Sequence, residues 1–474
     1  MKAILILLLG VLLGNAGWST AAPRPDIVIF LTDDQSQLDA TSYGARDLHT
    51  PNMQRLADAG LTFTRAFVVS PSCAPSRAAL LTGLMPARNG AEPNHSKPRA
   101  DLKKWPAYFQ ELGYEVVAFG KVSHYRHTVD YGFDYFAHDT FHDHAAIPAA
   151  VEFLKKREGG TGKPLCLFVG SNWPHVPWPE QSDDFDPATL TLPAGSVDTP
   201  ETRRWRARYA AAVAKADSEL GLIYDTARTA LGNDTLFAFT SDHGAQWPFG
   251  KWNLYDSGIQ TPLTVVWPGV VKPGTRTDAM VSWLDLLPTL LEAAGGTPPS
   301  DIDGRSFLPV LRAEKSEHRD RIFTTHSGDG GWNIYPMRSI RTAAWKYILN
   351  LHPEFAYTTH IDLGRSRDGR EFWSSWENAA RTDKKAAAIV KRYRQRPAEE
   401  LYDLSTDPHE QQNLATDLQH AARLEKMRAE LEAWMRELGD RRQVFHEPRL
   451  LDDPASYGPN APPGDAWPKG DRKR

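Results

Sequence analysis

The chain has 474 residues, of which 41% are hydrophobic and 24% are charged, and its net charge at pH 7 is -4. This is an ordinary globular composition, and a chain of this length can bury a sizeable core. The near-neutral charge argues against a nucleic-acid partner, so an anionic substrate would have to meet a local cluster of cations.

The N-terminus has the pattern of a secretory signal peptide. Lys2 carries one positive charge, an apolar run extends from Ala3 to Leu13, and small residues follow at 19–22. We expect cleavage after Ala21, which makes residues 1–21 a signal peptide and the protein an exported one, periplasmic or secreted, or lysosomal in a eukaryote. The run is short for a membrane span and no later stretch replaces it, so we predict no stable membrane insertion.

Strand-like and helix-like segments then alternate. Continuous apolar runs, typical of buried strands, lie at 26–31, 114–119, 165–169 and 235–240. Segments with helical spacing, bounded by capping residues, Pro or Gly, lie at 50–60, 101–112 (with Asp101 as the cap) and 205–231. The alternation predicts an α/β fold, with a large, mostly parallel sheet flanked by helices in a catalytic domain at 22–330.

The pattern changes after about residue 330. Short strand-like segments lie at 337–341, 345–349 and 400–404, and a helical segment follows at 417–438. We therefore predict a small C-terminal α+β domain with an antiparallel sheet at 331–447. Residues 448–474 are rich in Pro, Gly and charge, which is typical of a tail without its own core.

Polar side chains follow four of the predicted strands. In chain order they are Asp33 and Asp34, Lys121 and His124, His175, and Asp242 and His243. Each group alone has a simpler explanation, since an Asp pair after a strand is usually a turn or a helix cap and a lone His is more often structural or exposed. Ligands in open α/β sheets bind outside the carboxyl ends of the strands, however, so four such groups favour one common site.

The residue types in this expected site indicate its chemistry. The three carboxylates form an oxygen-rich set that suits a hard cation such as Ca²⁺ or Mg²⁺. His124 and His175 are natural proton carriers. Positive charge for an anionic substrate comes from Arg77, Lys121 and Lys251. Together these groups predict the hydrolysis of a phosphate or sulfate ester.

The segment from Pro71 to Gly83 distinguishes the two esters. Its Cys-x-Pro-Ser-Arg sequence, followed by Leu-Thr-Gly, resembles the signature of the formylglycine-dependent sulfatases, a family of the alkaline phosphatase-like superfamily. A helix expected to begin at Pro75 places Cys73 near a helix N-terminus, which favours an anion. The alternative is a free structural cysteine, as we expect for Cys166 inside an apolar strand.

The resemblance covers most of the chain. Residues 26–34, 250–255, 283–289 and 402–414 are similar to runs of that family. Pro336–Arg341 most resembles the heparan N-sulfatases and their bacterial relatives. Two positions depart from the common pattern: His243 stands where most members have Asn, and His124 follows Lys121 by three residues, as in the iduronate-2-sulfatase branch.

The resemblance also implies cofactors and roles. A formylglycine-generating maturation enzyme would oxidise Cys73, and Asp33, Asp34, Asp242 and position 73, with His243 less certain, would bind Ca²⁺ or alternatively Mg²⁺. A hydroxyl of the hydrated aldehyde would attack sulfur while Arg77 and Lys121 hold it. His175 and Lys251 would protonate the leaving atom, and His124 would accept a proton as sulfate departs.

The expected substrate is a sulfated carbohydrate, with N-sulfoglucosamine as the first hypothesis. Arg338 and Arg341 could reach its carboxylate or sulfate, or could simply be exposed strand residues. Alternatives are an O-sulfatase acting on uronate or algal polysaccharide fragments, a phosphonate monoester or phosphodiester hydrolase, and a catalytically silent protein that binds sulfated glycans.

Overall fold

The computed structural model describes residues 24–474 except 159–161, 365–367, 459–460, 463 and 465–474. The predicted signal peptide and most of the second half of the predicted tail lie outside the described residues. Within the described part of the chain, no helix combines the length and the apolarity that crossing a membrane requires.

The main sheet has eight strands in the order β5-β4-β6-β1-β7-β8-β2-β9. β1 pairs in parallel with both β6 and β7, and β4 pairs in parallel with β5 and β6, whereas β8 runs antiparallel to β7 and β2. The strands are β1 (Ile27–Thr32), β2 (Leu61–Phe63), β4 (Glu115–Gly120), β5 (Tyr135–Ala137), β6 (Leu165–Gly170), β7 (Leu236–Ser241), β8 (Leu263–Val266) and β9 (Thr275–Thr277). The predicted mostly parallel sheet is confirmed.

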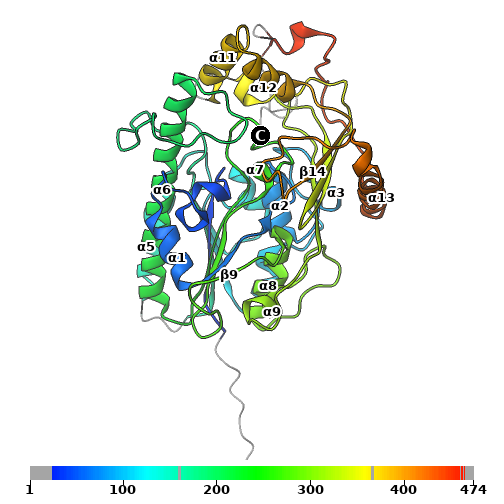
Figure 1. Ribbon diagram of the computed structural model, residues 1–474. Helices are drawn as coiled ribbons and strands as arrows, with labels where there is room; N and C mark the ends of the chain where they lie inside the picture. Colours follow the sequence, from blue (N-terminus) through cyan, green and yellow to red (C-terminus); the bar gives the residue numbers. More distant parts are fainter. Residues whose placement is uncertain (1–23, 159–161, 365–367, 459–460, 463, 465–474) are drawn as a thin grey trace, which may run out of the picture.

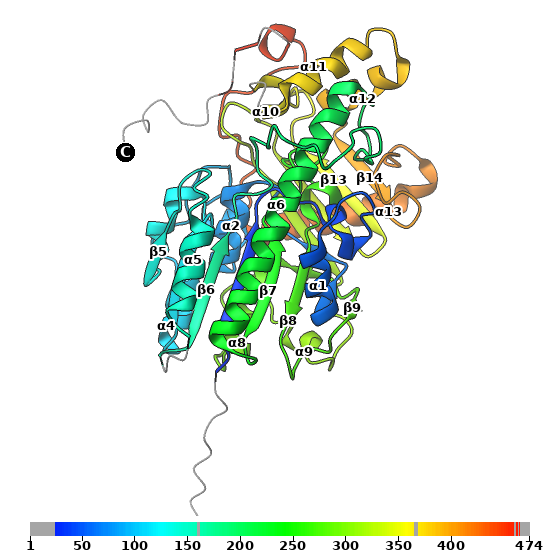
Figure 2. The same cartoon turned by 90° about the vertical axis from the view of Figure 1, so that its left-hand side faces the viewer.

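Helices cover both faces of this sheet, which explains why its central strands are continuous apolar runs (Figure 2). In β1, Ile27 and Ile29 pack on one side and Val28 and Phe30 on the other. Each such side chain contributes about 1.5–3 kcal/mol on burial. The helices on the Ile27 side are α2 (Cys73–Thr82), α4 (Trp105–Glu111) and α8 (Leu286–Ala293), and those on the Val28 side are α1 (Pro51–Ala59), α5 (Ala146–Lys155) and α6 (Pro200–Leu231).

Four antiparallel strands form a second sheet in the order β11-β12-β13-β14, which confirms the predicted C-terminal architecture. They are β11 (Arg321–His326), β12 (Met337–Thr342), β13 (Trp345–Asn350) and β14 (Glu399–Asp403). α13 (Ala421–Leu438) packs on this sheet through Leu424, Met427 and Leu431. The boundary predicted at residue 330 falls in the connection between β11 and β12.

Other elements join these layers. Figure 1 shows α11 and α12 at the top of the molecule, above the sheets. They belong to an insertion between β13 and β14 that contains α10 (His360–Leu363), α11 (Arg370–Ala379) and α12 (Lys384–Arg394). The remaining short elements are β3 (Ala66–Phe67), which pairs with β10 (Val281–Ser282), and the helices α3 (Pro86–Asn89), α7 (Asp256–Ile259) and α9 (Leu308–Leu311).

Three helix starts differ from their prediction. α4 begins at Trp105 with Lys104 as its N-cap, so Asp101 is not the cap. α6 begins at Pro200, where the Thr199 side chain accepts a hydrogen bond from the Thr202 amide. α2 begins at Cys73 and not at Pro75. Proline is tolerated anywhere in the first turn of a helix, because the N–H that it lacks would have no partner there. A proline therefore indicates the first turn but not which residue begins the helix.

Glycines bring the ends of β4 and β6 close together. Gly120 has φ +74°, and a Cβ on it would lie 2.1 Å from the Gly170 carbonyl oxygen. Only glycine can adopt this left-handed conformation and also allow the Gly170 carbonyl oxygen to approach so closely without strain. The chain therefore turns directly from β4 to Lys121 at the carboxyl end of the sheet.

Candidate active site

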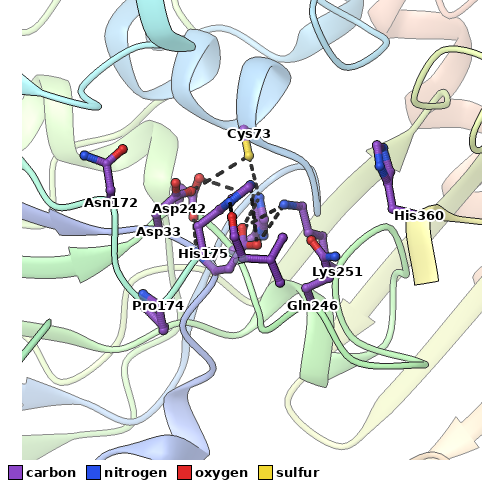
Figure 3. Close-up of polar contacts among 12 residues, drawn as sticks. Asp33, Cys73, Asn172, Pro174, His175, Asp242, Gln246, Lys251 and His360 are labelled. Carbon is purple, nitrogen blue, oxygen red and sulfur yellow. Dashed lines mark hydrogen bonds and ion pairs between the residues drawn. The ribbon is translucent and has the colours of Figure 1, made fainter. Parts of the chain in front are cut away.

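The carboxyl ends of four neighbouring strands bring most of the predicted site residues together. β4, β6, β1 and β7 are adjacent in the sheet. Figure 3 shows Cys73 pointing from α2 toward Asp33 and Asp242, with His175 and Lys251 close by. The convergence expected from the strand ends is thus present.

Asp33 is buried between two cations. Its Oδ2 lies 2.5 Å from the Lys121 Nζ, and its Oδ1 lies 3.3 Å from the Arg77 Nη2. Burial alone would raise the pKa of Asp33, but Lys121, His175 and Arg77 hold it well below its usual range. This carboxylate is therefore ionised.

Arg77 connects two strand ends from α2. Its Nε donates to Asp242 Oδ2 at 2.9 Å, and its Nη1 donates to the carbonyl oxygen of Lys121. The side chain has no exposed surface. Together with the contact to Asp33, these bonds attach the guanidinium to the ends of β1, β4 and β7. They therefore fix its orientation.

Asp34 lies in the left-handed region with φ 67° and turns its carboxylate inward. Its two oxygens lie 2.9 and 2.8 Å from the Lys251 Nζ, and its amide donates to Asp242 Oδ1 at 3.0 Å. Burial raises the pKa of Asp34; Lys251 opposes this shift, and the neighbouring Asp33 and Asp242 add to it. A second cation close to Asp34 would therefore stabilise its charged form.

The buried charges of this cluster balance. Its carboxylates are Asp33, Asp34 and Asp242, its cations are Arg77, Lys121 and Lys251, and each side chain is at most 3% exposed. Removing one partner of a buried pair typically costs about 3–5 kcal/mol, because the other charge is left uncompensated. We call these six residues the carboxylate cluster.

Cys73 is the first residue of α2 and is 2% exposed. Its Sγ lies 3.3 Å from His243 Nε2, 3.4 Å from Lys121 Nζ and 3.9 Å from Asp33 Oδ1. Burial raises the pKa of the thiol to about 12, although Lys121 and Lys251 oppose the shift. The unmodified side chain is therefore a neutral thiol and a poor nucleophile.

Four side chains can hold a cation. One ligand atom each from Asp34, Cys73, Asp242 and His243 lies within 4.8 Å of the others. Asp33, the further predicted ligand, lies beside this group with its Oδ1 3.9 Å from Cys73 Sγ. Two of the four ligand atoms are carboxylate oxygens, which Ca²⁺ and Mg²⁺ prefer, whereas the imidazole nitrogen and the sulfur are softer ligands.

His243 strengthens the fit to a cation. Its Nδ1 lies 3.0 Å from the Gly244 carbonyl oxygen, which requires a donor, so Nε2 carries the lone pair in the neutral ring. This Nε2 lies 3.4 Å from Asp34 Oδ1 and 3.5 Å from Asp242 Oδ2. A lone pair facing two carboxylates is repulsive unless a proton or a metal ion lies between them.

His175 lies beside the cluster, with Nε2 3.9 Å from Asp34 Oδ2 and Nδ1 2.5 Å from the Val176 carbonyl oxygen. Burial, with Lys251 and Lys121 nearby, holds the pKa of His175 well below its usual range. Its side chain is 12% exposed, more than any member of the carboxylate cluster. It is thus placed to meet a group that enters from solvent.

His124 belongs to a second, adjoining network. Its Nε2 lies 2.8 Å from His95 Nδ1, and His95 Nε2 lies 3.0 Å from Asp329 Oδ1. Asp329 is buried and also accepts hydrogen bonds from Trp252 Nε1 at 2.6 Å and from Asn94 at 3.1 Å. The sequence did not identify His95 or Asp329, since neither follows a predicted strand.

His360 completes the same network from the insertion. Its ring stacks on those of Trp252 and Trp332, with centroids 5.2 and 4.4 Å apart, and its Nε2 lies 3.5 Å from Asp329. Figure 3 shows it away from Cys73, on the far side of Lys251. The imidazole is therefore held rigidly at the edge of the site.

Arg338 and Arg341 require a correction, because the structure does not bring them to the cluster. Arg338 is buried and paired with Asp440, and Arg341 lies 2.9 Å from Asp256. They are not exposed strand residues either, since they are 0% and 5% exposed. A buried guanidinium neutralised by a carboxylate stabilises the fold, so neither side chain is free to reach a sugar in the site around Cys73.

Two sequence families match the chain. The family described as Sulfatase matches residues 25–296, and the one described as N-sulphoglucosamine sulphohydrolase, C-terminal, matches residues 243–386.

Individual proteins are similar over most of the chain. An ulvan-active sulfatase of Formosa agariphila is 32% identical over 435 aligned residues, covering 89% of this chain and 82% of that protein. The N-sulphoglucosamine sulphohydrolase of Homo sapiens is 29% identical, covering 88% and 91%. A solved complex of a protein with its substrate D-glucosamine-2-N,6-O-disulfate has a TM-score of 0.65 at 20% identity, covering 88% of this chain and 99% of that one.

The correction at Arg338 can be tested. We expect Arg338→Met to lower the free energy of unfolding by about 3–5 kcal/mol, because it leaves the Asp440 carboxylate buried without its partner. Chemical denaturation measures this. Arg321→Met on the neighbouring strand is the matched control and should cost under about 1 kcal/mol, because its partners Asp320 and Glu430 are 77% and 26% exposed. Equal stability of the two variants would contradict the structural role of Arg338.

Proposed function

The chain belongs to the sulfatase family of carbohydrate sulfate hydrolases, and we propose that it acts through a formylglycine made from Cys73 together with a divalent cation. The observation that carries this proposal is the position of Cys73. Its Sγ lies within 3.4 Å of both Lys121 and His243, at the first turn of α2 and beside buried carboxylates. These charged groups stabilise a neutral thiol only weakly. The two hydroxyl groups of a hydrated aldehyde, in contrast, could donate hydrogen bonds to the carboxylates and bind a cation.

The chain's own residues would organise the reacting group. When present, the hydrated aldehyde supplies a hydroxyl nucleophile for sulfur, and the cation polarises the oxygens around it. Lys121 holds its ammonium 3.4 Å from position 73, fixed there by Asp33. Arg77, oriented by Asp33 and Asp242, keeps the surrounding carboxylates ionised and in place.

Lys251, a fixed ammonium, would protonate the departing atom of the sugar. His175, the other predicted donor, is neutral here and would donate only after an anionic substrate had raised its pKa. Asp34 fixes the Lys251 ammonium by both oxygens, and His175 lies at the solvent side of the same carboxylate. The sugar leaves a sulfate ester as an alcohol and a sulfamate as an amine. In both cases the departing oxygen or nitrogen atom needs a proton at this stage.

His124 would be the base that accepts a proton as sulfate leaves. His95 Nε2 lies 3.0 Å from the ionised Asp329 carboxylate, which favours the tautomer with a proton on Nε2, so the neutral His95 ring would present its Nδ1 lone pair to the Nε2 proton of His124. The lone pair of His124 then lies on Nδ1, a buried atom with no hydrogen-bond partner among the described residues. Burial, His95 and Lys121 hold the pKa of His124 well below its usual range, so this base is unprotonated at neutral pH.

N-sulfoglucosamine is the substrate we propose first. The support is the C-terminal family match and the human relative, both named for N-sulphoglucosamine sulphohydrolase. The relative from Formosa agariphila is named for ulvan, so O-desulfation of an algal polysaccharide fragment is the second candidate. We also propose export, from the N-terminal segment, and a formylglycine-generating enzyme as the maturation partner.

Cys73→Ala should reduce turnover of any sulfated substrate to background, because it removes the only source of the nucleophile. In active protein, mass spectrometry should find the peptide containing position 73 lighter than its cysteine form and reactive with hydrazides. Cys166→Ala is the matched control, since Cys166 is a core residue of β6, and it should retain turnover. Full activity of Cys73→Ala would contradict the proposed chemistry.

Ca²⁺ or Mg²⁺ should raise the thermal stability of the protein, by about 2.7 kcal/mol when the ion is at 100 times its Kd. Asp34→Ala should lose this ion-dependent increase and the bound ion itself, as measured by calorimetry and elemental analysis. Asp58→Ala, at an exposed position on α1, should keep both. Unchanged metal content in Asp34→Ala would place the cation elsewhere.

Separate incubations with N-sulfated and O-sulfated glucosamine should distinguish the substrate candidates. Release of free amine from the N-sulfated sugar is the expected result. Exclusive O-desulfation, or activity on algal fragments alone, would contradict N-sulfoglucosamine and leave the sulfatase assignment intact. Faster turnover of nitrophenyl phosphate or phosphonate esters than of nitrophenyl sulfate would favour the phosphohydrolase alternative.

A further inference from the structure

A cavity of about 710 Å³ lies between the main sheet and the C-terminal sheet, and no member of the carboxylate cluster lines it. Its walls come from residues 36–39, 43–47, 191–194, 245–250 and 408–411, together with α7, which Figure 1 shows near the centre of the molecule. The segment 245–250 forms part of the wall, and the next residue, Lys251, contacts Asp34. The cavity is therefore a neighbour of the active site with a separate lining.

The lining carries an excess of arginine. Its arginines are Arg46, Arg65, Arg206, Arg341 and Arg392, and its carboxylates are Asp39, Asp47, Asp256 and Glu410. Three of these carboxylates are already neutralised: Arg206 lies 2.8 Å from Asp39, Arg341 lies 2.9 Å from Asp256, and Lys346 lies 2.7 Å from Glu410. Arg65 lies 3.5 Å from Asp278, so the lining arginines without an ion pair among the described residues are Arg46 and Arg392, and they outnumber the one remaining carboxylate, Asp47.

Two buried nitrogen atoms on this wall have no hydrogen-bond partner among the described residues: Arg206 Nη1 and Trp247 Nε1. The two residues are 5% and 2% exposed. The other nitrogens of Arg206 donate to the Thr191 carbonyl oxygen and to Asp39. Both atoms have almost no accessible surface, so a ligand in the cavity does not reach them, and the preference for an anion rests on the guanidinium groups of the lining.

Arg392 is held in place without a carboxylate. It donates to the Glu410 carbonyl oxygen and to the Gln411 side chain, both neutral. Its guanidinium lies 4.8 Å from the ring centroid of Phe249 and 5.4 Å from that of Tyr255. An arginine fixed on aromatic rings keeps its charge available for a planar or tetrahedral anion.

We propose that this cavity is a second, non-catalytic binding site for an acidic saccharide, in which Arg46 and Arg392 contact a sulfate or carboxylate group. The choice of a saccharide rests on the proposed function, whereas the preference for an anion rests on the lining itself. Guanidinium groups match the oxygens of sulfate and carboxylate with paired hydrogen bonds. A volume of about 710 Å³ accommodates one or two sugar rings.

Calorimetric titration of the Cys73→Ala protein with a sulfated hexasaccharide tests this site, because that variant binds without turnover. Arg46→Ser combined with Arg392→Ser should weaken binding at least tenfold, since each charge-assisted contact contributes about 1.5–3 kcal/mol. Arg312→Ser combined with Lys315→Ser, at exposed positions just after α9, is the control for general electrostatic attraction and should change affinity less than twofold.

Unchanged affinity in the Arg46 and Arg392 variant, or an equal loss in the Arg312 and Lys315 control, would overturn the second site. Desulfated hexasaccharide should bind the Cys73→Ala protein more weakly than the sulfated one, and equal binding would also contradict an anion site. Hydrolysis of a small aryl sulfate by the wild-type protein reports on the active site alone. Its failure would overturn the proposed function without altering the binding result.

Discussion

The burial of three carboxylates at one edge of the main sheet is the constraint on which the site depends. Asp33, Asp34 and Asp242 have almost no exposed surface, and burying such charges unpaired would be prohibitive. Their partners come from three separate parts of the chain: α2, the end of β4, and the loop that follows β7. Neutralising the carboxylates therefore positions these elements relative to one another, and the same contacts orient the groups that face position 73.

Charge balance also explains why the site suits an anion. Three carboxylates and three cationic side chains cancel, so a divalent cation adds an excess of two positive charges in a region with little water. Interactions there are stronger than in bulk solvent. A sulfate group entering from solvent would meet this excess, and the lone pair of His243 Nε2 would gain a partner. A cation at this position and an affinity for an anion would therefore have the same electrostatic cause.

The features that could be predicted from the sequence are those that depend on local residue pattern. Continuous apolar runs identified β1, β4, β6 and β7, and the polar residues after them converge as expected because parallel strands end at one edge. The roles of Arg338 and Arg341 were not predictable, since their carboxylate partners are 102 and 85 residues away in the chain. His95 and Asp329 lie in irregular segments whose contacts arise only from the tertiary fold. Sequence pattern thus identified the strand ends but not the network that orients His124.

The burial of Cys73 has a consequence for how the protein is made. Its thiol is 2% exposed and enclosed by side chains whose positions depend on the completed sheet. Under the proposed chemistry, an oxidising enzyme can reach this thiol only while the polypeptide is still open, before β1, β4 and β7 assemble around it. Folding and oxidation are then competing events during biosynthesis. A molecule that folds first remains permanently inactive, so the specific activity of a preparation records the outcome of that competition.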